Sequence, residues 1–413
     1  MNTYKIIFLS LILLQFVFNL VLKLLSSKQA SKPLPASVQG IYDESEYNKW
    51  RSYQNKKDKL GLISGIISLV INLALFGTNL ISIIYNAMPG NGVMVKSILF
   101  FLVVGLVETI VSLPIEYVFN FKIEAEFGFN KITPKTFIAD TIKNFLLGNV
   151  INIIIFGLVV FAHSLLDKYF GIIVFVGLTL FVLLINAFSS VFSKIFNKFT
   201  PLQEGGLRTN LSKMFADAGF ALKDIYVMDA SKRTTKANAY CGGIGKLKQI
   251  VLYDNLVNDY TEGEITAVFA HELAHFKNKD TTKMAFFNML NFLPMMVMMT
   301  VVMLVPEIAQ SYGFEDVNAH IFFAFYLSFG SVLSIIASLI MIPFNYMSRR
   351  FERRADSLAY ELGYGDDLVS ALRKLHKDSL ADMNPHPTVV KLTYNHPPLH
   401  ERIELIESKK SGK

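Results

Sequence analysis

Residues Ser97 to Phe119 read SILFFLVVGLVETIVSLPIEYVF, an almost uninterrupted apolar run. A bilayer core needs about 20 such residues as a helix, because backbone groups left unpaired in hydrocarbon cost several kcal/mol each. Working outward, six more segments meet this length, so the sequence predicts a mainly α polytopic membrane protein with seven transmembrane helices. The other predicted spans are Ile6 to Leu25, Leu60 to Tyr85, Phe145 to Leu166, Phe170 to Val191, Ala285 to Val305 and Ile321 to Met347.

The composition supports the membrane assignment. Of the 413 residues, 52% are hydrophobic and only 18% are charged, whereas soluble domains carry about 25% charged residues. The single cysteine, Cys241, excludes an internal disulfide and a thiolate metal cluster, so any metal ligands must be histidines and carboxylates. The net charge of +7 is more typical of basic cytoplasmic loops than of nucleic-acid binding, and we expect no nucleic-acid partner.

Lysine and arginine are distributed asymmetrically between the predicted spans, which indicates the orientation. The segments after the first and third spans and the tail from Arg349 onward are rich in them, whereas the alternate connections are nearly bare. This pattern predicts a cytoplasmic C-terminus, a cytoplasmic segment between the fifth and sixth spans, and an outward N-terminus. The membrane is expected to be the cell membrane in a prokaryote and the endoplasmic reticulum membrane in a eukaryote. The first span lacks a cleavage site typical of a signal peptide, so we predict that it is retained.

Polar residues within the spans form a second pattern. Each one alone is explained by hydrogen bonding between helices, but together they favour an aqueous interior. They are Asn72, Asn79, Glu108, Glu116, Asn149, Asn152, His163, Asn186, Asn288, Asn291 and Asn345.

From Ser193 to Thr282 the composition changes to that of a soluble domain. We therefore divide the chain into residues 1–192, with five spans, and residues 193–413, which hold the two further spans (285–305 and 321–347) and a cytoplasmic tail. Residues 207–218 have helical periodicity and end at a glycine. Runs at 224–230, 237–240 and 249–256 are typical of short strands and predict a small antiparallel sheet. Thr261 with Glu264 forms a capping box, which predicts the start of a helix.

That helix carries the motif His271-Glu272-Leu273-Ala274-His275. Histidines at i and i+4 share one helix face, so their imidazoles can converge on a single Zn²⁺ while Glu272 points toward the metal-bound water. The alternative is a pair of solvated helix histidines. It is disfavoured because the helix leads directly into the sixth span, which holds the motif at the membrane face.

A catalytic zinc takes three protein ligands and keeps one position for water. Cys241 is a poor third ligand because it lies among glycines in a predicted turn. Glu352 and Asp356, at i and i+4 directly after the last span, face the same way. We predict that Glu352 binds the metal and that Asp356 accepts a hydrogen bond from a ligand histidine. The alternative, a solvated acid among four arginines, is disfavoured by the histidine motif.

Several motifs now form an ordered set. HELAH at 271–275 and ERRAD at 352–356 are accompanied by NAY at 238–240 and by HPPLHERI beginning at His396. FKIEAEFGFN at 121–130 follows the third span. Together they resemble the type I CAAX prenyl protease family of integral-membrane zinc metallopeptidases, and the resemblance extends from about Glu44 to Ile406. H-E-x-x-H alone is generic to zinc peptidases, whereas the ordered set is specific.

The resemblance implies that His271, His275 and Glu352 hold one zinc ion per chain and that Glu272 is the general base. It also implies seven long helices around a large intramembrane chamber, with a zincin-like α+β peptidase unit on the cytoplasmic side.

Three further roles follow from the resemblance alone. Asn238, on an edge strand beside the cleft, is implied to hydrogen-bond the extended substrate backbone. His396 is implied to stabilise the tetrahedral oxyanion, and Arg402 to support the site from nearby. The implied partners are the lipid bilayer and prenylated CAAX C-termini, from which the last three residues are removed.

The residues leave two other functions open. One is a membrane quality-control zinc peptidase of the heat-shock type, which the five spans ahead of the motif disfavour. The other is a non-catalytic membrane chamber or translocon-associated protein with a structural zinc, which the intact Glu272 disfavours.

Overall fold

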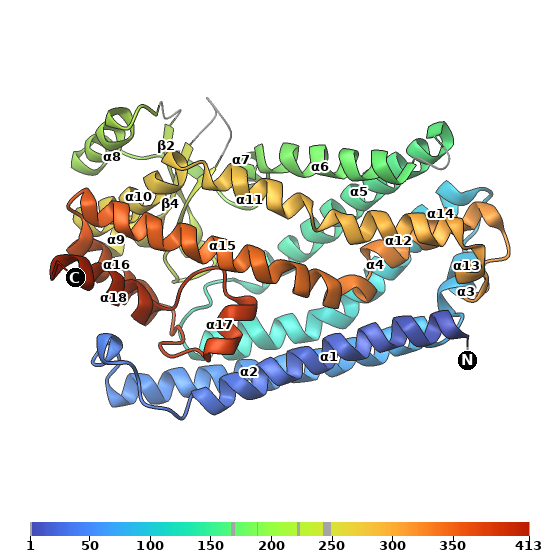
Figure 1. Ribbon diagram of the computed structural model, residues 1–413, viewed down its shortest axis with the longest axis horizontal. Coiled ribbons are helices and arrows are strands. Elements are labelled where there is room, and N and C mark those ends of the chain that lie inside the picture. The colour runs from blue at the N-terminus through green and yellow to red at the C-terminus, as the bar shows by residue number, and fades with distance from the viewer. Residues whose placement is uncertain (1, 167–169, 188, 221–223, 243–248, 413) are drawn as a thin grey trace.

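The computed structural model describes residues 2–166, 170–187, 189–220, 224–242 and 249–412. Within these ranges, six helices are long and apolar enough to cross a membrane. Figure 1 shows long helices running along the longest axis of the molecule, with the sheet near one end. The spans are built from α1 (Thr3–Gln29), α2 (Glu44–Gly77), α4 (Val93–Tyr117) with the π-helix Val118–Glu124, α5 (Pro134–Leu166), α11 (Asp280–Met289) with α12 (Phe292–Leu304), and α15 (Ser334–Glu361).

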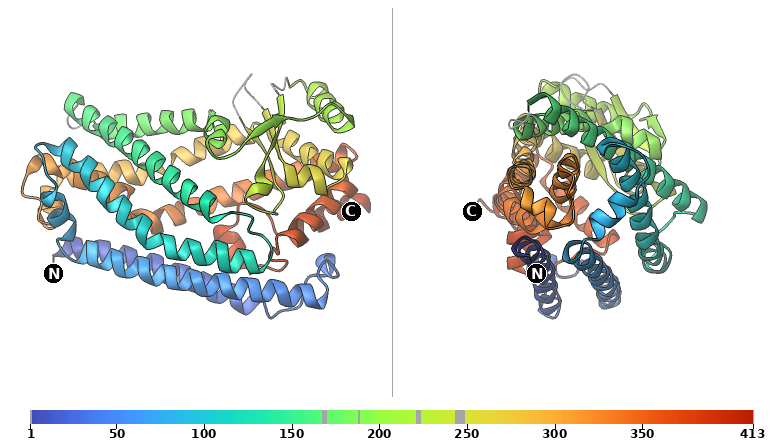
Figure 2. Two further views of the ribbon diagram at one scale, coloured as in Figure 1. Left: turned by 180° about the vertical axis from the view of Figure 1, so that it is seen from behind. Right: turned by 90° about the vertical axis from the view of Figure 1, so that its right-hand side faces the viewer.

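The outer faces of these helices are apolar and exposed. Leu24, Val70, Ile110 and Phe161 are each at least 60% exposed, and they lie on four different spanning helices. In water this surface would drive aggregation, whereas in a bilayer it contacts hydrocarbon. The predicted polytopic helical membrane fold is therefore confirmed. Figure 2 shows the helices arranged around a common axis in its right-hand view.

Local sequence signals start the N-terminal helices. The Asn2 side chain accepts a hydrogen bond from the Tyr4 N–H at the start of α1. Asp43 and Glu46 form a reciprocal capping box at the start of α2. These bonds satisfy amide groups that have no partner inside the helix.

The ends of the helices away from the sheet are joined by an aromatic core. Phe100 on α4, Phe156 on α5 and Phe322 on α14 (His320–Phe329) are fully buried and stack edge-to-face on their neighbours. Tyr312 follows α13 (Pro306–Gln310). Its hydroxyl donates to the carbonyl of Phe76 on α2 over 3.1 Å. The core therefore links segments far apart in the sequence.

Two predicted spans are interrupted, and the structure describes a third only in part. The span predicted at 60–85 ends at Gly77, and 80–87 forms a separate helix, α3 (Leu80–Ala87). The span predicted at 321–347 is broken at Gly330, whose extended backbone separates α14 from a single 3-10 turn and α15. In the predicted fifth span, the structure describes α6 (Phe170–Ala187) and α7 (Ser189–Phe196). The described part of α6 is apolar but below the spanning length.

Several polar residues of the spans form hydrogen bonds with nearby backbone carbonyls. Asn72 and Asn149 donate to carbonyls of their own helices, four residues earlier. Asn345 on α15 donates to the Leu392 carbonyl over 3.1 Å. The bond of Asn345 joins two helices and matches the explanation by hydrogen bonding between helices, whereas the bonds of Asn72 and Asn149 lie within one helix. An aqueous interior stays a prediction. The side chain of Asn186 lies outside the described residues.

The sheet is mixed rather than antiparallel as predicted. It contains β1 (Phe199–Pro201), β2 (Asp224–Met228), β3 (Ala239–Gly242) and β4 (Gln249–Tyr253) in the order β1-β2-β4-β3. β2 and β4 pair in parallel, because the connection between them contains β3 and returns the chain in the same direction. β3 pairs antiparallel with β4 only, so it is an edge strand of the described sheet. Cys241 lies in β3 and not in a turn.

Helices enclose this sheet and connect it to the last spanning helix. α8 (Gly206–Asp217) and α10 (Glu262–Lys277) pack against each other and share a buried core with β2 and β4. α10 also packs on α15. The remaining helices are α9 (Asp254–Asp259), α16 (Gly365–Asp378), α17 (Pro387–Thr393) and α18 (Leu399–Lys410).

Candidate metal centre

Helix α10 presents both histidines of the H-E-x-x-H motif on one face. It begins at the predicted capping box, in which Thr261 and Glu264 exchange side-chain to backbone hydrogen bonds. Its apolar residues hold the helix in the core: Ile265, Phe269 and Leu273 are at most 3% exposed. The position of the histidines is therefore fixed by packing as well as by helix periodicity.

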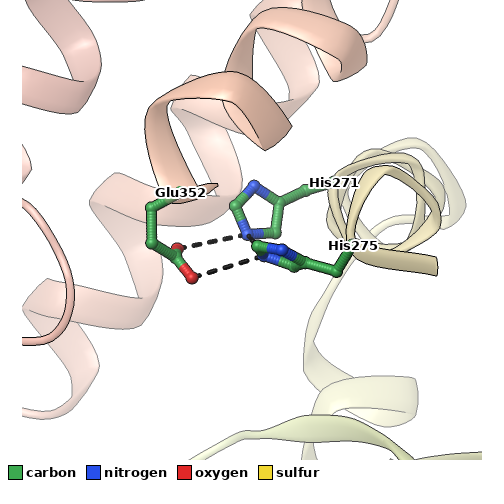
Figure 3. A group of neighbouring side chains, drawn as sticks. All are labelled: His271, His275 and Glu352. Carbon is green, nitrogen blue, oxygen red and sulfur yellow. Dashed lines mark hydrogen bonds and ion pairs between the residues drawn. The ribbon is translucent and has the colours of Figure 1, made fainter. Parts of the chain in front are cut away.

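Helix α15 brings a carboxylate against the two histidines. Glu352 Oε2 lies 3.3 Å from His271 Nε2, and Glu352 Oε1 lies 3.3 Å from His275 Nε2. The two Nε2 atoms are themselves 3.3 Å apart. Figure 3 shows the three side chains converging from the two helices. The predicted triad is thus assembled in space.

Each histidine is oriented by a carboxylate on its other ring nitrogen. His271 Nδ1 lies 2.9 Å from Asp356 Oδ1, and His275 Nδ1 lies 3.2 Å from Asp280 Oδ2. A carboxylate accepts a hydrogen bond, so each Nδ1 carries the proton and each Nε2 presents a lone pair. The two Nε2 atoms face each other beside Glu352, an arrangement that is repulsive unless a proton or a metal cation lies between them.

The donor set fits a zinc ion. Ligand atoms about 2.0 to 2.1 Å from a tetrahedral zinc lie about 3.3 Å from one another. The two Nε2 atoms are 3.3 Å apart, and each lies 3.3 Å from a different oxygen of the Glu352 carboxylate. His271, His275 and Glu352 are the group of described residues whose ligand atoms could hold a metal ion. Two imidazoles and a carboxylate are also ligands that catalytic zinc commonly uses.

Arg402 supports this arrangement from behind. Its Nε and a terminal nitrogen donate to the two oxygens of Asp356 over 2.9 and 2.6 Å. Asp356 is completely buried and Arg402 is 7% exposed, so the ion pair is shielded from water and holds the carboxylate in a fixed orientation. The chain of contacts runs from Arg402 through Asp356 to His271.

The local electrostatics favour a positive charge at the histidines. Burial alone would lower the pKa of His271, but hydrogen bonds with Asp356 and Glu352 outweigh burial and raise the pKa to about 9. A site that stabilises an extra proton on imidazole will also stabilise a divalent cation placed between the rings.

Two further predicted residues lie next to the triad. Glu272 is partly exposed, and it forms no hydrogen bond or ion pair with any residue that the structure describes. Its carboxylate is therefore available to water. His396, whose side chain is 58% exposed, places Nδ1 2.8 Å from Glu352 Oε2. The loop before α18 thus positions the His396 imidazole beside the three candidate metal ligands.

Asn238 lies at the start of the edge strand. Its carbonyl accepts a hydrogen bond from the Tyr253 N–H over 3.0 Å, which extends the pairing of β3 with β4 by one residue. Its side-chain oxygen accepts a hydrogen bond from the Ala239 N–H over 2.8 Å. Among the described residues, no hydrogen bond joins Asn238 to the triad.

Asp280 belongs to the site but was not predicted from the sequence. It follows His275 by five residues, which is outside the helical spacing that places side chains on one face. The helix ends at Lys277 with Asn278 as its C-cap, and Lys279 takes a left-handed conformation with φ of 55°. This turn brings Asp280, the first residue of α11, back toward His275. The sequence signal that could have identified it is the presence of an acidic residue shortly after the H-E-x-x-H motif.

Comparisons with known proteins cover almost the whole chain. It is 30% identical to a CAAX prenyl protease 1 homolog of Oryza sativa, over 98% of this chain and 97% of that protein. It is 29% identical to CAAX prenyl protease 1 of Saccharomyces cerevisiae, over 98% and 95% of the two chains. The crystal structure of S. mikatae Ste24p superposes with a TM-score of 0.91 at 28% identity, covering 98% of this chain and 100% of that chain.

Family models divide the chain in two. Residues 23–198 match the CAAX prenyl protease N-terminal model, which describes five membrane helices, and residues 201–410 match the model of peptidase family M48. With the membrane-spanning body and the His–His–Glu donor set, these matches define a membrane metalloprotease. The chain belongs to peptidase family M48.

Proposed function

We propose that this metalloprotease uses one zinc ion to remove the C-terminal tripeptide from prenylated CAAX-type proteins. The observation that carries the proposal is the convergence of His271, His275 and Glu352, in which each Nε2 lies 3.3 Å from the other and 3.3 Å from an oxygen of the carboxylate. The names of the rice and yeast relatives support the substrate class. Glu352 lies on α15, one of the six helices long and apolar enough to span a membrane, which supports a lipid-modified substrate.

Glu272 is the proposed general base. When bound, zinc supplies a Lewis acid that lowers the pKa of water to about 7. Glu272 follows His271 on α10 and has no competing partner among the described residues, so it can take a proton from the attacking water. It then returns the proton to the leaving amine, and no covalent enzyme intermediate is needed.

His396 and Asn238 are proposed to act on the substrate. An N–H of His396 is positioned at the edge of the donor set, where it can donate to the oxyanion that forms on the scissile carbonyl. One such donor commonly contributes about 3 kcal/mol to transition-state stabilisation. Asn238 precedes the edge strand β3, which can pair with an extended peptide backbone.

Asp356, Asp280 and Arg402 are proposed as positioning residues. They touch ligand side chains or each other rather than the substrate, and they fix which histidine nitrogen faces the metal. The surplus of lysine and arginine in the loops on the side of the site supports a cytoplasmic active site. The division into residues 1–192 and 193–413 is part of the same proposal.

The decisive test of the chemistry is Glu272→Gln. The amide cannot take a proton, whereas the ligands and their carboxylate partners are unchanged. Purified variant should keep wild-type zinc content by elemental analysis and lose cleavage of a fluorogenic CAAX peptide. Undiminished cleavage would contradict the proposal. Glu262→Gln, on the first turn of the same helix, is the matched control and should retain activity.

The substrate class needs a separate comparison. A farnesylated CAAX peptide and the same peptide with a free cysteine are offered to the wild-type protein in parallel. We expect a higher kcat/KM for the farnesylated peptide. Equal values would show that the lipid is not recognised while leaving the peptidase chemistry intact.

A further inference from the structure

The segment that leads into the edge strand is held by the loop after the third predicted span. The N–H of Lys131 donates to the Arg233 carbonyl over 3.0 Å, and the N–H of Thr235 donates to the Phe129 carbonyl over 3.2 Å. Asn130 and Thr234 form an antiparallel bridge between these bonds. The FKIEAEFGFN motif at 121–130 therefore pairs, at its end, with the backbone just before β3.

A partly buried ion pair reinforces this backbone pairing: the Lys236 side chain is 32% exposed and the Glu124 side chain is 10% exposed. Lys236 Nζ lies 2.8 Å from Glu124 Oε2 and donates to the Tyr53 hydroxyl over 3.1 Å. The Tyr53 hydroxyl in turn donates to Glu124 Oε1. Lys236 Nζ also lies 4.3 Å from the centre of the Phe129 ring. The lysine is thus bound by a carboxylate, a phenol and an aromatic face.

The carboxylate in this cluster comes from the membrane-spanning body. Glu124 is the last residue of the π-helix Val118–Glu124 that continues α4, and Tyr53 lies on α2. Glu124 is 7% exposed and Tyr53 is 2% exposed. π-helical turns are rare and occur frequently at functional sites. An ion pair with a buried carboxylate contributes little net stability, so the main effect of this pair is the geometry that it imposes.

We propose that Glu124 and Lys236 are positioning residues that fix the edge strand β3 for substrate binding. Lys236 precedes Asn238 by two residues, a distance of about 7 Å along an extended chain, so its anchor point lies at the entrance to the strand. On the other side, Asn255 Nδ2 donates to the Thr234 carbonyl over 2.7 Å. The segment leading into the strand is therefore bonded both to the membrane-spanning helices and to the peptidase core.

This inference rests on the proposed function, because it assumes that the substrate backbone pairs with β3. A displacement of about 1 Å between a substrate and the reacting groups can cost roughly 10²-fold in rate. Loss of the anchor should therefore reduce catalysis without altering the donor set, since neither residue contacts His271, His275 or Glu352.

The test removes both charges at once. Removing one partner leaves a buried charge, which is strongly destabilising, whereas a neutral pair is tolerated. The full-length Glu124→Gln/Lys236→Met protein is purified in detergent with zinc and assayed with a fluorogenic farnesylated CAAX peptide. We expect kcat/KM to fall at least tenfold, within the roughly 10²-fold range for misplacement. Zinc content and the inhibition constant of a small hydroxamate, which report on the metal site alone, should stay unchanged.

The matched control is Lys56→Met/Glu126→Gln. This ion pair also joins α2 to the same loop, but its side chains are 42% and 51% exposed, so its loss should have little effect. Lys236→Arg keeps the cation and should stay within a few-fold of wild type.

Each other outcome has a definite meaning. If the neutral variant matches the control in kcat/KM, the inference is wrong. If it loses zinc or hydroxamate affinity together with activity, the cluster is only structural and the inference is also wrong. If the wild type cleaves no peptide, the proposed function itself fails.

Discussion

Asp280→Asn isolates the contribution of a carboxylate that orients one metal ligand. The wild-type carboxylate accepts a hydrogen bond from His275 Nδ1 over 3.2 Å and so keeps the lone pair on Nε2. Asparagine preserves the shape but removes the negative charge. Loss of such a partner typically costs 10 to 100-fold in metal affinity, or about 1.4 to 2.7 kcal/mol. The bond is longer than the 2.9 Å bond from His271 to Asp356, so we expect about tenfold.

The structure also indicates that this substitution will not unfold the protein. Asp280 contacts Arg354, whose side chain is 43% exposed and can remain hydrated when the acid is neutralised. Asp356→Asn would be a poorer choice, because it would leave Arg402 buried without its anion. Removing one partner of a buried pair typically costs about 3 to 5 kcal/mol.

The assay is a zinc competition titration of metal-stripped protein against a chromophoric chelator. The Kd of Asp280→Asn should rise about tenfold, while its thermal unfolding in EDTA should match the wild type. Arg354→Gln is the control, because it removes a different partner of Asp280 and keeps the contact with His275. An unchanged Kd in Asp280→Asn would refute the view that this carboxylate orients the ligand.

Two further predictions concern metal binding and pH. Glu352→Ala should lose zinc in elemental analysis, because only two of the three protein ligands are left; full metal retention would remove Glu352 from the ligand set. Burial lowers the pKa of His376 on α16 from 6.5 to about 4, so the unfolded chain binds the proton first as the pH falls. The stability that neutral His376 contributes is therefore present above pH 6.5 and is lost between pH 6.5 and 4, by up to about 3 kcal/mol. In EDTA, His376→Gln should show a smaller fall in Tm between pH 7 and pH 5 than the wild type does; equal falls would contradict this.

Features that depend on neighbouring residues could be predicted from the sequence. The membrane-spanning segments follow from runs of apolar residues, because the bilayer acts on each helix separately. The convergence of His271 and His275 follows from helix periodicity, and the start of α10 follows from the capping box at Thr261. Periodicity alone does not pair Glu352 with the histidines. That prediction also used the rule that a catalytic zinc takes three protein ligands, and in the structure the carboxylate does lie beside both rings.

Other features were decided only by the tertiary structure. The break at Gly330 and the parallel pairing of β2 with β4 depend on how segments pack across the chain. The same holds for the return of Asp280 to His275 and for the ion pair between Glu124 and Lys236. Hydropathy and helix periodicity describe residues a few positions apart, whereas these contacts form between elements whose relative placement is set by the whole core. For this protein, the sequence by itself therefore determined the membrane class and the metal-binding motif, and the tertiary structure determined how the motif is supported.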